Sequence, residues 1–203
     1  MKKILLAALP IAAIAIMAFT SISEPLPIGS TLPNADAKMK DISGKEVSFR
    51  DAAKKNGLLV MFSCNTCPVV KKYQGRTLES ARLAASKNIG VILLNPNEAT
   101  RETGDSYDDM KAYAKEQGYD FSYVVDQHSA MADAFGATRT PEVFLFDKNN
   151  KLVYHGAIDA NQDAPGDKEN RKHLNIAIEE LATGKAIETT TTRSVGCGIK
   201  RVK

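Results

Sequence analysis

The stretch Leu58-Leu-Val-Met-Phe-Ser-Cys-Asn-Thr-Cys-Pro-Val-Val70 decides the fold of this chain. Its first five residues are apolar, which is the length and composition of a strand buried on both faces of a sheet. From Val70 onward, apolar residues recur every three or four positions, which predicts a helix that packs against that sheet. Cys64 and Cys67 therefore lie at a junction between a buried strand and a helix.

The rest of the chain continues this alternation of strands and helices. Further strands are predicted over 91–94, 122–125, 142–146 and 151–155, and further helices over 110–117, 129–135 and 174–183. A parallel crossover needs a helix on the sheet face, whereas the closing hairpin is antiparallel. Upstream, Ser43-Gly44 predicts the turn of a small hairpin. Together these patterns predict an α/β fold: a three-layer α/β/α sandwich with a mixed central sheet and an N-terminal hairpin extension.

The composition indicates one globular domain. The 203 residues are 43% hydrophobic and 25% charged, which is ordinary for a folded domain of this size. The formal net charge is +3, and two of those charges are Lys2 and Lys3 at the N-terminus. The remaining chain is close to neutral, which gives no electrostatic basis for nucleic acid as a partner.

The N-terminus has the layout of a secretory signal peptide. A short basic start is followed by the apolar run Ile4–Phe19 and then by small residues that include Ser21 and Ser23. An uncleaved membrane anchor is the alternative. We divide the chain into a signal peptide or anchor (1–23), the predicted α/β sandwich domain (24–185) and a C-terminal tail that carries Cys197 (186–203). Both readings place the domain in the periplasm or cell envelope, where disulfides persist.

Cys64 and Cys67 have the spacing of a redox dithiol. Unpaired backbone amides and the helix dipole favour a thiolate at a helix start, and the thiolate is the attacking species. We expect Cys64 to be the exposed nucleophile with a lowered pKa, and Cys67 to be the resolving thiol. A static disulfide or part of a zinc site are the alternatives. Zinc normally needs four ligands, and Cys197 and the three histidines show no paired spacing, so we expect no metal and no other cofactor.

Thr140-Pro141 comes directly before a predicted strand. A cis bond at this place would leave a backbone edge free to pair with an extended substrate. An ordinary trans proline at the start of a strand is the alternative.

The chain resembles the thioredoxin-like superfamily and, within it, the redoxin group (alkyl hydroperoxide reductase / thiol-specific antioxidant family). Five segments carry the resemblance in the family's order: Cys64-Asn-Thr-Cys-Pro-Val-Val-Lys71, Leu94-Asn-Pro-Asn97, Arg139-Thr-Pro-Glu-Val-Phe-Leu-Phe-Asp147, Tyr154-His-Gly156 and Gly196-Cys-Gly-Ile-Lys200. The likeness covers roughly 26–200. It implies the fold, a redox dithiol at Cys64 and Cys67, and a cis Pro141.

A second alignment is with peroxiredoxins, which carry Thr-x-x-Cys-Pro. In this alignment Cys67 is the peroxide-reactive cysteine and Cys64 resolves it. Arg139 then resembles the arginine that stabilises the attacked peroxide oxygen. The alternative for Arg139 is an ordinary surface residue.

Two further residues are candidates for the site. Cys197 could relay electrons to Cys64, bridge to another chain, or lie buried and inert. Asp126 ends a short predicted strand and could accept a proton from the less exposed thiol, or it could be a turn residue before the helix that begins at Ser129.

These features predict an exported thiol–disulfide oxidoreductase with Cys64, Cys67 and Pro141 at its centre. A peroxiredoxin-like thiol peroxidase with antioxidant activity is the first alternative, and a non-catalytic binding module on the same fold is the second. The expected partners are protein disulfides or peroxide, together with an upstream thiol redox partner.

Overall fold

The structure is a computed structural model that describes residues 24–164 and 166–202. The predicted signal peptide or anchor therefore lies outside the described residues. Within those described, no helix combines the length and the apolar character needed to cross a membrane.

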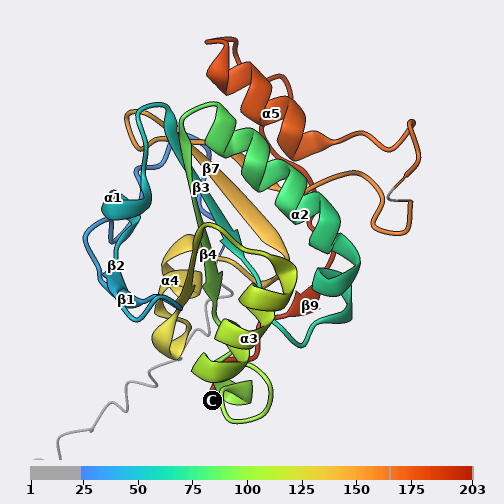
Figure 1. Cartoon of the computed structure of the whole chain (residues 1–203). Helices are drawn as coiled ribbons and strands as arrows, with labels where there is room; N and C mark the ends of the chain where they lie inside the picture. The colour runs from blue at the N-terminus through green and yellow to red at the C-terminus, as the bar shows by residue number, and fades with distance from the viewer. Residues whose placement is uncertain (1–23, 165, 203) are drawn as a thin grey trace, which may run out of the picture.

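Five strands of the described chain form one mixed central sheet (Figure 1). They are β3 (Gly57–Phe62), β4 (Ile89–Asn95), β5 (Ser122–Val125), β7 (Glu142–Asp147) and β8 (Leu152–Gly156). β4 and β5 are parallel, whereas β7 is antiparallel to both β3 and β8. Backbone hydrogen bonds from Asn56 to Asn88 and from Ser63 to Leu94 place β4 beside β3 in the same direction. The order β5-β4-β3-β7-β8 confirms the predicted mixed sheet.

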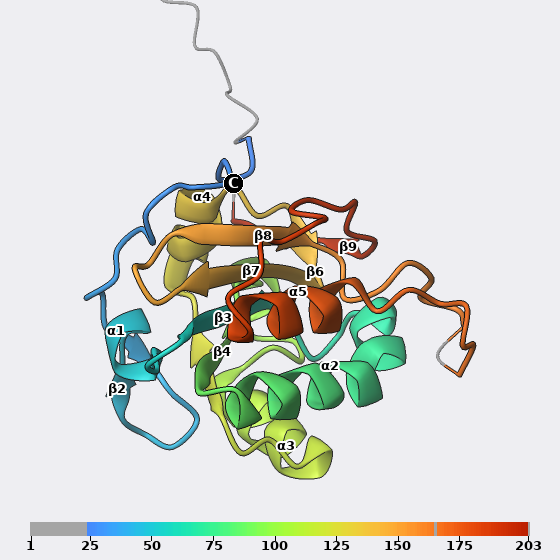
Figure 2. The ribbon, with the colours of Figure 1, turned by 90° about the horizontal axis from the view of Figure 1, so that it is seen from above.

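Helices cover both faces of this sheet. They are α1 (Phe49–Ala52), α2 (Pro68–Ser86), α3 (Tyr107–Gln117), α4 (Ala130–Phe135) and α5 (His173–Ala182), with short 3-10 turns at Glu98–Thr100 and Gln127–Ser129. Side chains of β3 alternate between two apolar layers, as a strand requires. Leu59 and Met61 pack with α2, α3 and α5, whereas Leu58 and Val60 pack with α1 and α4. Figures 1 and 2 show α2 and α5 side by side on one face. The predicted three-layer sandwich is therefore confirmed.

The predicted N-terminal hairpin is also present. β1 (Met39–Lys40) pairs antiparallel with β2 (Glu46–Val47). Gly44 takes a φ of +86° in the turn between them, a backbone conformation that glycine adopts without steric cost.

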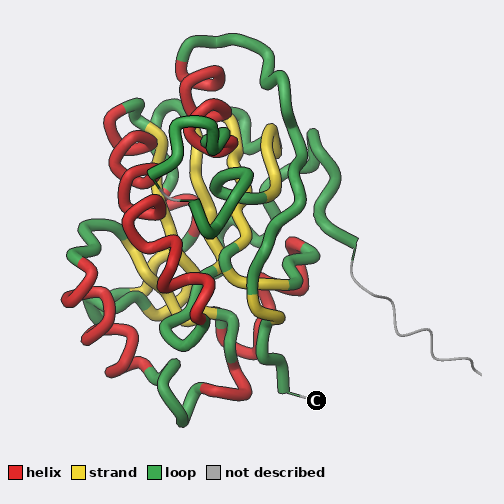
Figure 3. Tube along the Cα trace, turned by 90° about the vertical axis from the view of Figure 1, so that its right-hand side faces the viewer, coloured by secondary structure: helices red, strands yellow, loops and turns green. Residues whose placement is uncertain are grey.

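The C-terminal tail runs alongside β8, and its end is marked in Figure 3. Thr191 first bridges in parallel to His155 of β8. Further on, β9 (Cys197–Gly198) pairs antiparallel with β6 (Arg139–Thr140). The sequence predicted neither strand, because two residues are too few to show a period. This short pairing brings Cys197 to the junction between β3 and α2.

Candidate active site

The two cysteines of the central motif lie at the predicted strand–helix junction. β3 ends at Phe62 and α2 begins at Pro68, with Cys67 in the N-cap position directly before the helix. Pro68 is tolerated in the first turn because its missing N–H would have no partner there. Cys64 and Cys67 are both buried and belong to one small apolar cluster with Val70.

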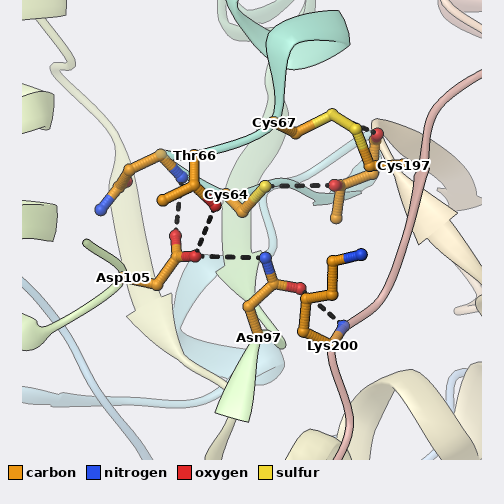
Figure 4. Close-up of a disulfide and its surroundings, with 9 residues drawn as sticks. Cys64, Thr66, Cys67, Asn97, Asp105, Cys197 and Lys200 are labelled. Atoms are coloured by element: carbon orange, nitrogen blue, oxygen red, sulfur yellow. Dashed lines mark hydrogen bonds between the residues drawn. A yellow bond between two sulfur atoms is a disulfide. The ribbon is translucent and has the colours of Figure 1, made fainter. Parts of the chain in front are cut away.

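A disulfide joins Cys67 to Cys197, across 130 residues of sequence and a Cα–Cα distance of 6.1 Å. Within the described chain, Cys64 is the free thiol. Cys197 is half-buried and packs against the same cluster as the other two cysteines. Figure 4 shows the three cysteine side chains gathered in one place. Cys197 is therefore bonded within its own chain, to the second cysteine of the central motif.

Thr140 contacts both sulfurs of the central motif. Its hydroxyl lies 3.2 Å from Cys64 Sγ, and its carbonyl oxygen lies 3.4 Å from Cys67 Sγ. The bond from Thr140 to Pro141 is cis, which confirms that prediction. The strand that carries this threonine thus forms one wall of the site.

Cys64 is fully buried, with 0% of its surface exposed, so the expectation of an exposed Cys64 is wrong. Burial raises the pKa of the Cys64 thiol, and the negative charge of Asp105 adds to that effect. The Thr140 hydroxyl and the backbone amides of Cys67 and Thr66 favour the thiolate, yet they do not offset the loss of solvent. The expected amides of the helix start are present, but the pKa moves upward because the sulfur lies in an apolar enclosure.

Removing the Thr140 hydroxyl is expected to raise the pKa of Cys64 further, because the thiolate loses a donor. Thr140→Val should also cost about 1 kcal/mol of stability. Thr140→Ser keeps the hydroxyl and should leave the titration close to that of the wild type. The thiolate absorbance, followed against pH in protein with the Cys67–Cys197 disulfide closed, reports Cys64 alone. A titration that is the same in the valine and serine variants would contradict this role.

Asp105 is a buried carboxylate beside the cysteines. It accepts hydrogen bonds from Asn65 N, Thr66 Oγ1, Asn95 Nδ2, Asn97 Nδ2 and Thr100 Oγ1, at 2.8 to 3.2 Å. Burial raises the pKa of Asp105, but these donors outweigh it and hold the pKa below its ordinary value. Figure 4 shows its bonds to Thr66 and Asn97. An ionised Asp105 therefore ties the turn between Cys64 and Cys67 to the loop after β4.

The sequence did not reveal Asp105, which lies in a polar segment without the apolar periodicity of a helix or strand. Two of its partners, Asn65 and Thr66, lie 40 and 39 residues away in the sequence, and the topology brings them to Asp105. Asn97 also accepts a hydrogen bond from the backbone N–H of Lys200 at 3.0 Å. The same network thus reaches the C-terminal tail.

Arg139 holds the tail. Its Nη1 donates to the carbonyl of Ser194 at 3.1 Å, and its Nε donates to the Thr138 hydroxyl at 3.3 Å. The side chain is half-buried, and its donors reach the tail backbone. These contacts give the arginine a part in docking the tail.

Glu142 of β7 and His155 of β8 form a buried pair, with His155 Nε2 at 2.7 Å from Glu142 Oε1. Glu142 also accepts from the backbone amides of Thr138 and Arg139 at 2.8 and 3.2 Å. The pair therefore fixes the backbone that faces the tail. The sequence indicated only that His155 has no potential metal-ligand partner at paired spacing.

Asp126 matches its turn-residue alternative rather than the predicted proton acceptor for a thiol. Its carboxylate accepts hydrogen bonds from the amides of Met131 and Ala132 at 2.8 and 2.9 Å, in the first turn of α4. These amides have no partner within the helix, so a carboxylate there satisfies them. The carboxylate that influences Cys64 is Asp105.

The contribution of Asp126 to stability is expected to be larger in mild acid than at neutral pH. Burial raises the pKa of Asp126 from 3.8 to about 6, although the helix amides oppose the shift. The folded state then binds a proton more tightly than the unfolded chain, so stability falls as the pH rises from 3.8 to about 6. The contribution is at most about 3 kcal/mol. Urea unfolding across this pH range should give a difference in stability between wild type and Asp126→Asn that moves against the wild type as the pH rises, and a constant difference would contradict this.

Within residues 24–164 and 166–202, no three histidine, cysteine or acidic side chains are grouped so that they could hold a metal ion. The sheet with helices on both faces and the cysteine pair at the strand–helix junction define a thioredoxin-like protein. The match to the Redoxin family model spans residues 27–172, and the chain belongs to that family.

Two solved structures share most of the fold. One is an uncharacterized conserved protein from Geobacillus kaustophilus, with 29% identity, a TM-score of 0.80, and 87% of this chain and 93% of that chain covered. The other is a hypothetical protein from Sinorhizobium meliloti 1021, with 30% identity, a TM-score of 0.80, and coverage of 89% and 97%. No curated protein matches the sequence.

More distant structures include thiol–disulfide oxidoreductases and peroxiredoxins. One is the thioredoxin domain of a thiol-disulfide oxidoreductase from Bacteroides vulgatus, with 21% identity, a TM-score of 0.53, and 64% of this chain and 88% of that chain covered. At this identity the likeness shows the fold alone.

Proposed function

We propose that this protein is an exported thiol–disulfide oxidoreductase in which Cys67 exchanges its disulfide partner between Cys197 and Cys64. One observation supports this most strongly: three cysteines pack together at the start of α2, with one pair bonded and one thiol free. A purely structural disulfide needs no third sulfur beside it.

The internal exchange is a balanced displacement. Cys64 first loses its proton, and its sulfur forms a bond to Cys67 Sγ. The bond between Cys67 and Cys197 breaks, and its electron pair leaves on the Cys197 thiolate, which then takes a proton. No electrons are gained or lost. Because burial raises the pKa of Cys64, this step is expected to accelerate as the pH rises.

Cys197 is the entry point for an external thiol. It is half-buried, whereas Cys64 and Cys67 are 0% and 3% exposed. A thiol reductant that attacks Cys197 displaces the Cys67 thiolate, which the unpaired amides at the start of α2 stabilise. A second thiol then releases Cys197, so two thiols are oxidised to a disulfide and the protein gains two thiols. The reduced protein would pass those two electrons to a protein disulfide.

We also propose export, on the basis of the basic start and apolar run within residues 1–23. An oxidising compartment favours a disulfide such as Cys67–Cys197 in the resting protein. Expression of the full chain in a bacterium, followed by fractionation and N-terminal sequencing, tests this. A chain recovered with its first residues intact in the cytoplasm would contradict it.

Reduction of insulin by a thiol reductant tests the main proposal. The wild-type chain should accelerate the reaction well above the reductant alone, and the chain with all three cysteines replaced by serine should not. Equal rates for the two chains would overturn the assignment.

One observation also favours a thiol peroxidase. Cys67 stands directly before Pro68 at a helix start and is bonded to a distant cysteine. Attack of Cys67 on a peroxide would give a sulfenic acid and an alcohol or water, and condensation with Cys197 would give this disulfide and water. Consumption of peroxide by the reduced chain, faster than by free cysteine, distinguishes this candidate from the first.

A further inference from the structure

Cys197 contacts the site through both its side chain and its backbone. Its sulfur is bonded to Cys67, and its backbone pairs antiparallel with Thr140 in the β6–β9 ladder. Ile199 continues the ladder by donating its N–H to the carbonyl of Thr138 at 3.0 Å. An extended peptide that adds to a sheet edge gains affinity from such main-chain bonds and specificity from the side chains that fit beside them. β9 therefore lies in the site as an extended peptide cysteine would.

The residue before this cysteine is held against the wall of the site. A Cβ on Gly196 would lie 2.2 Å from the carbonyl oxygen of Thr140 and 2.6 Å from its carbonyl carbon. Backbone atoms cannot move aside as the tip of a flexible side chain can. A Cβ on Gly198, on the far side of the cysteine, would meet nothing within 4 Å. The β6 edge therefore favours glycine before the cysteine and tolerates a side chain after it.

We propose that the β6 edge prefers substrate disulfides whose cysteine lies in an extended segment directly after a glycine, and that β9 occupies this edge as an internal stand-in for that substrate. The inference rests on the proposed function and adds the chemistry of the substrate. Thr140 and Pro141 disfavour a side chain before the cysteine, so they determine this preference. Cys67 is the sulfur that bonds to the docked cysteine.

An external substrate and the C-terminal tail would compete for the β6 edge. The tail is held by the bond from Lys200 N to Asn97 Oδ1 at 3.0 Å, by the bond from Ala99 N to Lys200 O at 2.8 Å and by Arg139 on Ser194. Once Cys197 is a thiol, β9 can leave and a substrate segment can enter. The Cys67 thiolate then attacks the substrate sulfur, and the second substrate cysteine leaves with the electron pair. Attack of Cys64 on Cys67 releases the first substrate cysteine as a thiolate and leaves a Cys64–Cys67 disulfide.

The first test uses the full chain with Cys64→Ser, so that Cys67 and Cys197 alone form the disulfide. Equilibration with reduced and oxidised glutathione gives the equilibrium constant for its formation. Adding Gly196→Ala should lower that constant about tenfold or more, because the strand no longer fits the edge. Adding Gly198→Ala is the matched control and should change it less than about twofold. Equal constants for the two alanine variants would overturn the proposal.

The second test measures docking in trans and does not depend on the folding of a glycine variant. The chain with Cys64→Ser and Cys197→Ser retains Cys67 as its thiol and is mixed with the peptide Val-Gly-Cys-Gly-Ile-Lys as its glutathione mixed disulfide. The Cys67–peptide disulfide should be favoured about tenfold or more over that of Val-Ala-Cys-Gly-Ile-Lys. The peptide Val-Gly-Cys-Ala-Ile-Lys should form its disulfide with Cys67 as favourably as the first peptide. The C-terminal tail of the protein competes equally with all three peptides.

The outcomes separate this inference from the proposed function. Mixed disulfides that form equally with all three peptides would overturn the docking site while thiol exchange at Cys67 stands. Failure of Cys67 to form a mixed disulfide with any peptide or with glutathione would overturn the proposed function itself.

Discussion

Replacement of Cys67 by serine is expected to abolish the catalysed reduction of insulin, so that the remaining rate equals that of the thiol reductant alone. Cys67 is bonded to Cys197 and packs in one cluster with Cys64, so both proposed disulfides pass through it. The loss should appear in the maximal rate, since no other sulfur can form the intermediate. Turnover in the presence of a thiol reductant, followed by insulin precipitation, measures it.

The other two cysteines provide the matched controls. Cys197→Ser should still form a Cys64–Cys67 disulfide, and Cys64→Ser should still form Cys67–Cys197. Each should therefore keep one closed disulfide on oxidation, whereas Cys67→Ser should keep both remaining thiols titratable. A disulfide between Cys64 and Cys197 in Cys67→Ser would contradict the central position of Cys67.

Asp105→Ala is expected to lower the free energy of unfolding by about 3 to 5 kcal/mol. The substitution removes the acceptor of five hydrogen bonds inside the protein, and several of their donors would stay buried without a partner. Asp108→Ala is the control, because the Asp108 side chain is 89% exposed and its loss should cost less than about 0.5 kcal/mol. Urea unfolding compares the two variants, and equal midpoints would show that the Asp105 network adds no stability.

The sequence predicted the strand–helix junction because apolar runs and helical periods are local signals. The run Leu58–Phe62 and the spacing from Val70 onward were sufficient to place Cys64 and Cys67 between a strand and a helix. The cis bond before Pro141 followed from the resemblance to the redoxin group. The mixed sheet followed from the order of its elements.

The partners of Cys67 and the burial of Cys64 could not be predicted in the same way. Cys197 stands 130 residues from Cys67 in a tail without periodicity, and only the two-residue pairing of β9 with β6 brings it to the site. A helix start predicts a lowered pKa from its amides, yet burial depends on every element that packs around the sulfur. Here that enclosure outweighs the amides and raises the pKa of Cys64.

Disulfide mapping of the wild-type chain along a glutathione redox titration tests the central claim most directly. Digestion after acid quenching and mass spectrometry identify which cysteine peptides are linked at each potential. We expect two linked pairs in the same titration, Cys67 with Cys197 and Cys67 with Cys64. A titration in which Cys64 never forms a bond with Cys67 would contradict the exchange on which the proposed function depends.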